Sequence, residues 1–105
     1  MGMDPYAEVD PIIEACVKAR GATLFTEWAG EPARFFHIPG ARPFECFQIS
    51  IGQPSAGRMA VRARSIDTDD GSEFEERWEA TAETLNRVLA SATQSVDGWR
   101  DRLPD

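Results

Sequence analysis

Residues 44–67 read FECFQISIGQPSAGRMAVRARSID, and this stretch decides the fold of the chain. Two runs of alternating apolar and polar residues, 44–51 and 58–67, flank a loop at 52–57 that contains Gly and Pro. The pattern predicts two antiparallel strands joined as a hairpin. If the loop closes symmetrically, Ile51 pairs near Met59. The apolar face of the hairpin, which we expect to form the core, consists of Phe47, Ile49, Ile51, Met59, Val61 and Ala63.

Two further strands are predicted before this hairpin. Residues 23–28 and 34–38 are rich in β-branched and aromatic side chains, and the breaks at 30–32 and 39–43 contain Gly and Pro. Each break suits a hairpin and is too short for the helical crossover that parallel strands need. We therefore expect the middle of the chain to be a four-stranded antiparallel meander.

A helix is predicted before the meander, over residues 10–20. Asp10 is a suitable N-cap, Pro11 suits the first helical position, and Gly21 suits the end of the helix. The apolar residues Tyr6 and Val9 continue the stripe backwards, which indicates an additional turn before Pro11.

A second helix is predicted to close the chain. Ser72 and Glu75 form a Ser-x-x-Glu capping box, so we expect the helix to begin there, to run to about residue 95 or 96 and to end at Gly98. Its apolar stripe comprises Phe74, Trp78, Leu85, Val88, Leu89, Ala92, Val96 and Trp99. The stripe is broad, which suits packing on a sheet better than a coiled coil. Trp99 lies beyond Gly98 and is left as a candidate contact with a partner.

These elements predict an α+β fold with the order α-β-β-β-β-α. Its N- and C-terminal helices would pack on one face of the sheet, giving a two-layer single domain over residues 1–105.

Composition narrows the functional classes. Eighteen Asp and Glu residues against eleven Lys and Arg give a net charge of −7, which repels nucleic acid phosphates and anionic lipids. The chain contains neither a basic, apolar secretory signal nor a stretch long enough to span a membrane, so we expect a cytoplasmic protein. Its two cysteines are expected to be reduced thiols.

Catalytic chemistry has few candidates. His37 is the single histidine, and across a hairpin it would lie near Glu45 or Cys46, depending on the register. Such a residue is more often part of a core edge than a catalytic base, so the sequence favours a protein that is not an enzyme.

No metal or cofactor is expected either. Asp67, Asp69, Asp70 and Glu73 surround Gly71, but with Gly71 at the sixth position of a calcium loop the ligand spacing fails. Turn formation and helix capping explain these acids without a metal.

Three arginines share the polar face of the hairpin: Arg58, Arg62 and Arg64. A sheet that reads single-stranded RNA also needs aromatic side chains on that face, and the candidates for that face are Phe36 and Phe44. We therefore expect solvated or ion-paired arginines and no nucleic acid partner.

The strand at 34–38 is apolar on both of its faces, which is typical of strands covered on both sides. Two helices cover one face, so a second copy or another protein is expected over the other. The expected contact residues are Phe36, Ile38, Phe44, Ile66 and Trp99. The sequence thus favours a non-catalytic protein-interaction module that forms a homodimer.

An alternative is a small-molecule-binding protein or small enzyme. Its pocket would lie between the first helix and the sheet, lined by Trp28, Phe35, His37 and Glu45.

In size, acidity and its amphipathic closing helix, the chain resembles the dimeric chaperones of type III secretion and, more loosely, small α+β regulators. The resemblance implies a dimeric, protein-binding role. It extends over the whole chain as composition and topology and assigns no role to any single residue. Those chaperones usually place a helix between strands where this chain has a hairpin loop.

Overall fold

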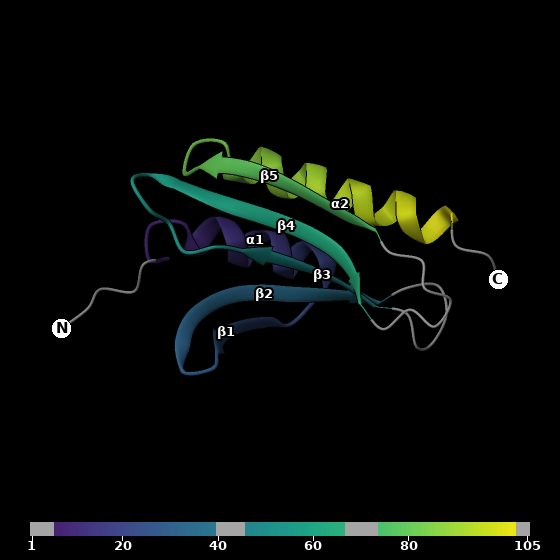
Figure 1. The fold of residues 1–105 in the computed structure, drawn as a ribbon, viewed down its shortest axis with the longest axis horizontal. Coiled ribbons are helices and arrows are strands. Elements are labelled where there is room, and N and C mark those ends of the chain that lie inside the picture. The colour runs from purple at the N-terminus through teal and green to yellow at the C-terminus, as the bar shows by residue number, and fades with distance from the viewer. Residues whose placement is uncertain (1–5, 40–45, 67–73, 103–105) are drawn as a thin grey trace.

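The computed structural model describes residues 6–39, 46–66 and 74–102. Its elements are α1 (Asp10–Arg20), β1 (Leu24–Trp28), β2 (Glu31–Pro39), β3 (Cys46–Ile51), β4 (Arg58–Ile66), β5 (Glu75–Thr81) and α2 (Leu85–Arg102). The strands form one antiparallel sheet in the order β1-β2-β3-β4-β5, and both helices lie on the same side of it (Figure 1). The predicted α+β fold and its meander are confirmed, with five strands in place of four.

The fifth strand replaces the predicted start of the closing helix. Trp78 pairs with Val61 and Ala80 with Met59, so these two residues of β5 face the helices. The prediction at Ser72 was wrong because the Ser-x-x-Glu motif is a local signal, whereas pairing with β4 satisfies backbone groups along an otherwise open edge. Ser72 itself lies outside the described residues.

The turn that does precede α2 has a reciprocal cap. The backbone N–H of Thr81 donates to Thr84 Oγ1 at 2.8 Å, and the N–H of Thr84 donates to Thr81 Oγ1 at 3.3 Å. Two backbone donors at the helix start are therefore satisfied by side chains. The helix then continues through Gly98 to Arg102, so the predicted end at Gly98 was also wrong.

Two hairpins turn on the same dipeptide. Ala29 and Gly30 join β1 to β2, Ala56 and Gly57 join β3 to β4, and all four residues have positive φ, as a two-residue type I′ turn requires. In the second hairpin Ile51 pairs with Val61, two residues from the predicted register. A shift of two preserves which side chains share a face, so the predicted apolar face remains intact.

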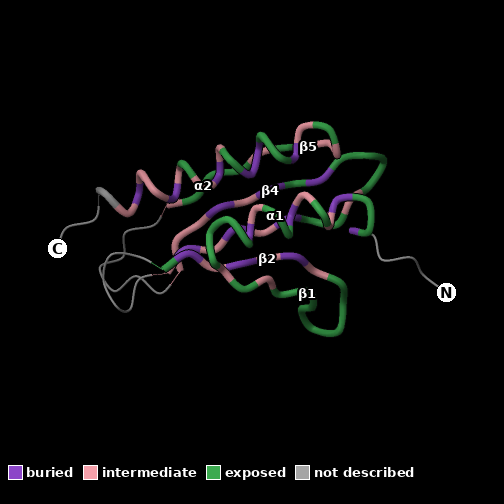
Figure 2. Tube along the Cα trace, turned by 180° about the vertical axis from the view of Figure 1, so that it is seen from behind, coloured by how far each residue is buried: buried purple, intermediate pink, exposed green. Residues whose placement is uncertain are grey.

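The core lies between the helices and the sheet, as the purple segments of Figure 2 show. At one end a buried Arg34 joins α1 to the sheet, because its guanidinium donates to both oxygens of Asp10 at 2.7 and 3.0 Å. It also lies over the ring of Tyr6 at 4.5 Å, and the Tyr6 hydroxyl donates to the Ile51 carbonyl at 2.7 Å. The predicted turn before α1 thus exists, and its apolar residues Tyr6 and Val9 are buried.

Candidate functional site

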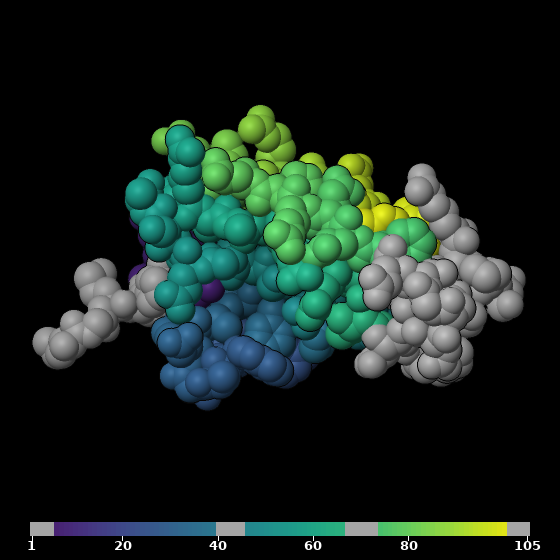
Figure 3. All heavy atoms as spheres, in the orientation of Figure 1, coloured from purple at the N-terminus to yellow at the C-terminus, as the bar shows by residue number. Residues whose placement is uncertain are grey.

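The helices cover one face of the sheet and leave the other open. Figure 3 views this second face, which we call the open face, with β1 and β2 in blue along its lower edge and β5 in green along its upper edge. Side chains alternate across a strand, so the residues opposite the core positions belong to the open face. Antiparallel sheets often expose such a face, and there it is usually polar.

One half of the open face is aromatic. Phe25, Trp28, Phe35 and His37, which we call the aromatic cluster, project from β1 and β2. Phe25 stacks on Phe35 with ring centroids 5.0 Å apart, and Trp28 meets Phe35 edge to face at 6.0 Å. The ring of His37 lies 5.3 Å from that of Phe25. Trp28 is 70% exposed and Phe25 41% exposed, so this packed cluster is left in contact with solvent.

The other half is charged. Arg58, Arg62, Arg64 and Arg77 lie on β4 and β5, and we call them the arginine half. They share this region with Glu75 and Glu79. Four arginines against two glutamates give this region a net charge of +2, whereas the whole chain carries −7.

Most of these arginines are ion-paired. Arg62 and Arg77 both pair with Glu75, and Arg58 pairs with Glu79 at 3.3 Å. The hydrogen bond from Arg62 lowers the pKa of Glu75 below its usual value. All of these pairs are solvent-exposed, so each adds little to stability.

Arg64 differs from its neighbours. Its Nε atom is buried and has no hydrogen-bond partner among the described residues. Beside it lies a hollow of about 370 Å³, lined by Tyr6, Trp28, Ala33, Arg34, Phe35, Gln48, Ser50, Ile51, Gly52 and Arg64. Arg64 thus combines an unmet donor with a place in the lining of a hollow that has both aromatic and polar walls.

The predicted alternative residues come together, but in a different place. Trp28, Phe35 and His37 all belong to the aromatic cluster, whereas Glu45 lies outside the described residues. Trp28 and Phe35 project from the face opposite α1, whereas His37 also lines a hollow beside the C-terminal end of α1. Buried core side chains occupy the space beneath α1.

The predicted partner-binding residues separate. Phe36 and Ile38 are buried in the core, because the register of β2 turns them toward the helices. Ile66 is half-buried and lies on the open face, across from Cys46. Phe44 lies outside the described residues.

Trp99 is not the exposed contact that the sequence indicated. It is 8% exposed and packs on Phe74 and Phe47, with ring centroids 5.4 and 6.1 Å away. The helix continues past Gly98 and carries the indole inward, so the sequence missed its burial for the same reason that it missed the helix end.

His37 is placed beside an amide and not beside a nucleophile. Its Nε2 lies 3.1 Å from Gln48 Oε1, its partner across the strands, while Cys46 pairs with Pro39 in the register. The Cys46 thiol donates to the Phe47 carbonyl at 3.7 Å. Neither of these hydrogen bonds links a base to a nucleophile, as general-base activation requires.

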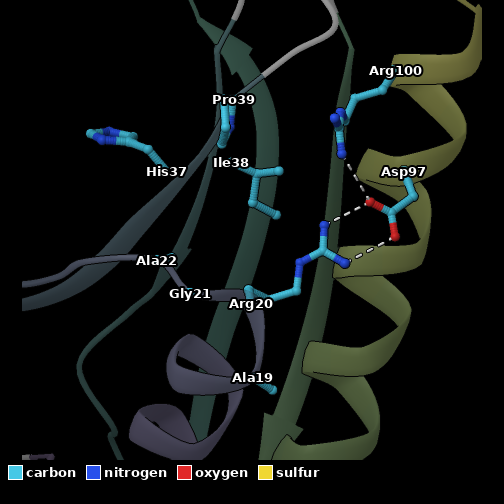
Figure 4. Close-up of a pocket in the computed structure, with 9 residues that line it drawn as sticks. All are labelled: Ala19, Arg20, Gly21, Ala22, His37, Ile38, Pro39, Asp97 and Arg100. Atoms are coloured by element: carbon cyan, nitrogen blue, oxygen red, sulfur yellow. Dashed lines mark hydrogen bonds and ion pairs between the residues drawn. The ribbon is translucent and has the colours of Figure 1, made fainter.

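A second hollow, of about 720 Å³, lies between the C-terminal ends of α1 and α2 (Figure 4). Arg20 donates to both oxygens of Asp97 at 3.1 and 2.7 Å, and Arg100 approaches the same carboxylate at 3.8 Å. The hydrogen bond from Arg20 lowers the pKa of Asp97. Figure 4 shows His37 pointing away from this ion pair. Arg20 and Arg100 share the one carboxylate of Asp97, and the Nε atom of Arg100 is buried without a hydrogen-bond partner among the described residues.

The remaining chemical groups offer no further site within the described ranges. No cluster of three or more His, Cys, Asp or Glu side chains is found in residues 6–39, 46–66 and 74–100. The acids considered for calcium, Asp67, Asp69, Asp70 and Glu73, lie outside those ranges. Burial raises the pKa of the Cys16 thiol, which makes it a poor nucleophile at neutral pH. No helix in the described part of the chain is long and apolar enough to cross a membrane.

Sequence reasoning missed Phe25 as an exposed residue. The Ala29-Gly30 turn does not contain the full signal, because a regular two-residue turn would pair Phe25 with Arg34, and the extra residue of β2 opposite Thr26 moves the pairing to Phe35. With that register, both rings fall on the face opposite Phe36.

Comparisons of the chain with protein-family models, with curated protein sequences and with solved structures find no match. The functional conclusion therefore depends on the geometry of the open face.

Proposed function

We propose that this chain is a non-catalytic protein-interaction module that binds its partner on the open face of the sheet. The observation that carries the proposal is the aromatic cluster, in which Trp28 and Phe25 remain solvent-exposed although they pack on Phe35. Isolated exposed apolar residues are ordinary, but a contiguous aromatic patch with a polar rim is typical of an interface. Aromatic and Arg residues are also the types enriched at interface cores.

The composition of the face also favours a protein partner over a nucleic acid. A sheet that reads single-stranded RNA needs aromatic side chains on the same face as its arginines, and Phe25, Trp28 and Phe35 meet this condition. However, Arg58 and Arg62 are neutralised by glutamates of β5, and those carboxylates would repel phosphates. A protein surface can bind the rings while the ion pairs stay intact.

The test is a comparison of three baits in a quantitative pull-down from the native cell. The first bait is the unchanged chain, the second carries Phe25→Ser and Trp28→Ser, and the third carries Glu14→Ser and Lys18→Ser on the exposed side of α1. We expect the first and third to retain the same protein, including a tagged copy of the chain itself, and the second to lose it. Equal retention by all three baits would contradict the proposal.

A small anionic ligand is the second candidate, favoured by the unpartnered Nε of Arg64 and the hollow beside it. Benzoate combines a carboxylate with a ring and is a suitable probe for Arg64 and Trp28. Titration with benzoate should change the fluorescence of Trp28 in the unchanged chain and not in Arg64→Gln. An unchanged Trp28 signal up to saturating benzoate would remove this candidate.

A further inference from the structure

The central strand β3 divides the open face into an aromatic half and an arginine half, with two strands on each side of it. Across the sheet, Phe35 pairs with Ser50, and Ser50 pairs with Arg62. One strand further out on each side, Phe25 pairs with Phe35 and Arg77 pairs with Arg62. A single row across the five strands therefore reads aromatic, aromatic, serine, arginine, arginine.

The next row repeats this arrangement on the three inner strands only, because Arg64 pairs with Glu75 on β5. His37 pairs with Gln48, and Gln48 pairs with Arg64. Each ring on β2 thus has an arginine at the same level on β4, with a small or neutral polar residue of β3 between them. Strands are about 4.8 Å apart, so the ring and the arginine lie at matching distances on either side of β3.

This arrangement is self-complementary under one particular symmetry. A twofold axis parallel to β3, running between two stacked sheets, places β1 and β2 of one copy over β5 and β4 of the other. A twofold axis perpendicular to the strands would instead place β4 over β4, and Arg62 and Arg64 would then face arginines. Like charges facing one another are unfavourable in an interface, so the first axis is favoured.

We propose that the partner on the open face is a second copy of this chain, related by a twofold axis that runs parallel to β3 past Ser50 and Gln48. This inference rests on the proposed function and names the partner of the same surface. Phe35 would lie against the partner's Arg62, and Phe25 against the partner's Arg77. A guanidinium stacks on an aromatic ring through cation–π attraction and can keep its in-plane hydrogen bonds while doing so. The ion pairs with Glu75 would therefore survive docking.

The charge of the chain is consistent with this arrangement. Of the net −7, the arginine half with its two glutamates carries +2, so the remaining acidic charge lies elsewhere on the chain. Copies that meet through the open face keep their most acidic surfaces apart.

A mixing experiment with two double variants tests the axis. The aromatic variant is Phe25→Ser with Phe35→Ser, and the arginine variant is Arg62→Ser with Arg77→Ser, so that each variant lacks one whole side of the row. Each homodimer loses all four ring-to-arginine contacts, so we expect its dissociation constant to rise at least tenfold over that of the unchanged chain. A mixed dimer keeps two of the four ring-to-arginine contacts, because Phe25 and Phe35 of the arginine variant meet the intact arginines of the aromatic variant. The equimolar mixture, with a donor fluorophore on one variant and an acceptor on the other, should therefore form a heterodimer at least tenfold tighter than either homodimer.

The controls separate this inference from folding and from the proposed function. Circular dichroism should show that both variants fold, and Phe25→Ser alone mixed with Arg77→Ser alone gives a milder pair if a double change does not fold. The Glu14→Ser, Lys18→Ser variant on α1 should dimerise like the unchanged chain. A mixture no tighter than the homodimers would overturn the axis. If the unchanged chain is strictly monomeric, the inference that the partner is a second copy is overturned. The proposed function would still stand in that case if the pull-down shows another protein that the unchanged bait retains and the Phe25→Ser, Trp28→Ser bait loses.

Discussion

Replacing Trp99 with alanine should destabilise the fold far more than the same change at Trp28. Trp99 is 8% exposed and stacks on Phe74, whereas Trp28 is 70% exposed and lies on the open face. A buried indole removes roughly 200 Å² from water, and at about 25 cal/mol per Å² the loss approaches 5 kcal/mol. Measured costs of Trp→Ala in cores are about 3–5 kcal/mol, and we expect Trp99→Ala in that range. Trp28→Ala should cost less than about 1 kcal/mol, since its single edge-to-face contact is with Phe35.

The assay is urea unfolding followed by far-UV circular dichroism, at protein concentrations low enough that association adds nothing to the midpoint. A domain of this size has a total stability of about 5–15 kcal/mol, so Trp99→Ala should lower the melting temperature by more than about 10 °C. Equal losses for the two variants, or a Trp99→Ala protein as stable as the unchanged chain, would refute the burial of Trp99 and the course of α2 beyond Gly98.

Three other changes test separate features. Gly98→Ala should raise the free energy of unfolding by about 1 kcal/mol, because Gly98 lies within α2 and a Cβ there meets nothing within 4 Å; a loss of stability would mean that the helix is broken there. Ala56→Asn should raise it by up to about 1 kcal/mol, because Ala56 has a φ of 52° and an Asn-Gly pair suits a type I′ turn better than Ala-Gly; a lower urea midpoint would contradict the turn. Asp97→Asn should lower the free energy of unfolding by less than about 1 kcal/mol at neutral pH, and this cost should vanish in acid. The reason is that Arg20 lowers the pKa of Asp97 in the folded state. The stabilisation from this ion pair is present above the pKa of the unfolded carboxyl group and is lost as pH falls through the lowered folded pKa. Unfolding curves at several pH values check this, and a cost independent of pH would contradict it.

Local signals in the sequence were sufficient for the bounds of α1 and for the presence of the first four strands, although the N-cap of α1 is Val9 and not the predicted Asp10, whose carboxylate accepts from Arg34 instead. The Gly21 end of α1 and the Gly-containing turns of the two hairpins each depend on backbone angles that few residues adopt. The alternation in β3 and β4 assigned the core face correctly although the register was two residues off, because a shift of two keeps every side chain on its face.

The fifth strand could not be predicted from such signals. Arg77 of β5 stands four residues after Glu73, a helical spacing, but the conformation of β5 is decided by pairing with β4. The end of α2 was missed for a related reason, since burial of Trp99 against Phe74 outweighs the small cost of Gly98 in a helix.

The candidate site was predicted in part. Trp28, Phe35 and His37, which the sequence placed in one candidate pocket, lie near one another in the structure, and their role as a binding site stays a prediction. The pairing of Phe36 with Ile49 decides which side chains of β2 face the helices and which lie on the open face. The sequence does not decide this when both faces of the strand are apolar.

The role of the open face is tested most directly by acrylamide quenching of tryptophan fluorescence over a dilution series, with sedimentation velocity on the same samples. Trp28 is far more exposed than Trp78 and Trp99, so quenching reports mainly on the aromatic cluster. If the open face binds a second copy, dimers should form as concentration rises and quenching should fall in parallel. A dimer in which Trp28 stays as accessible as in the monomer would contradict the assignment of the open face as the binding surface.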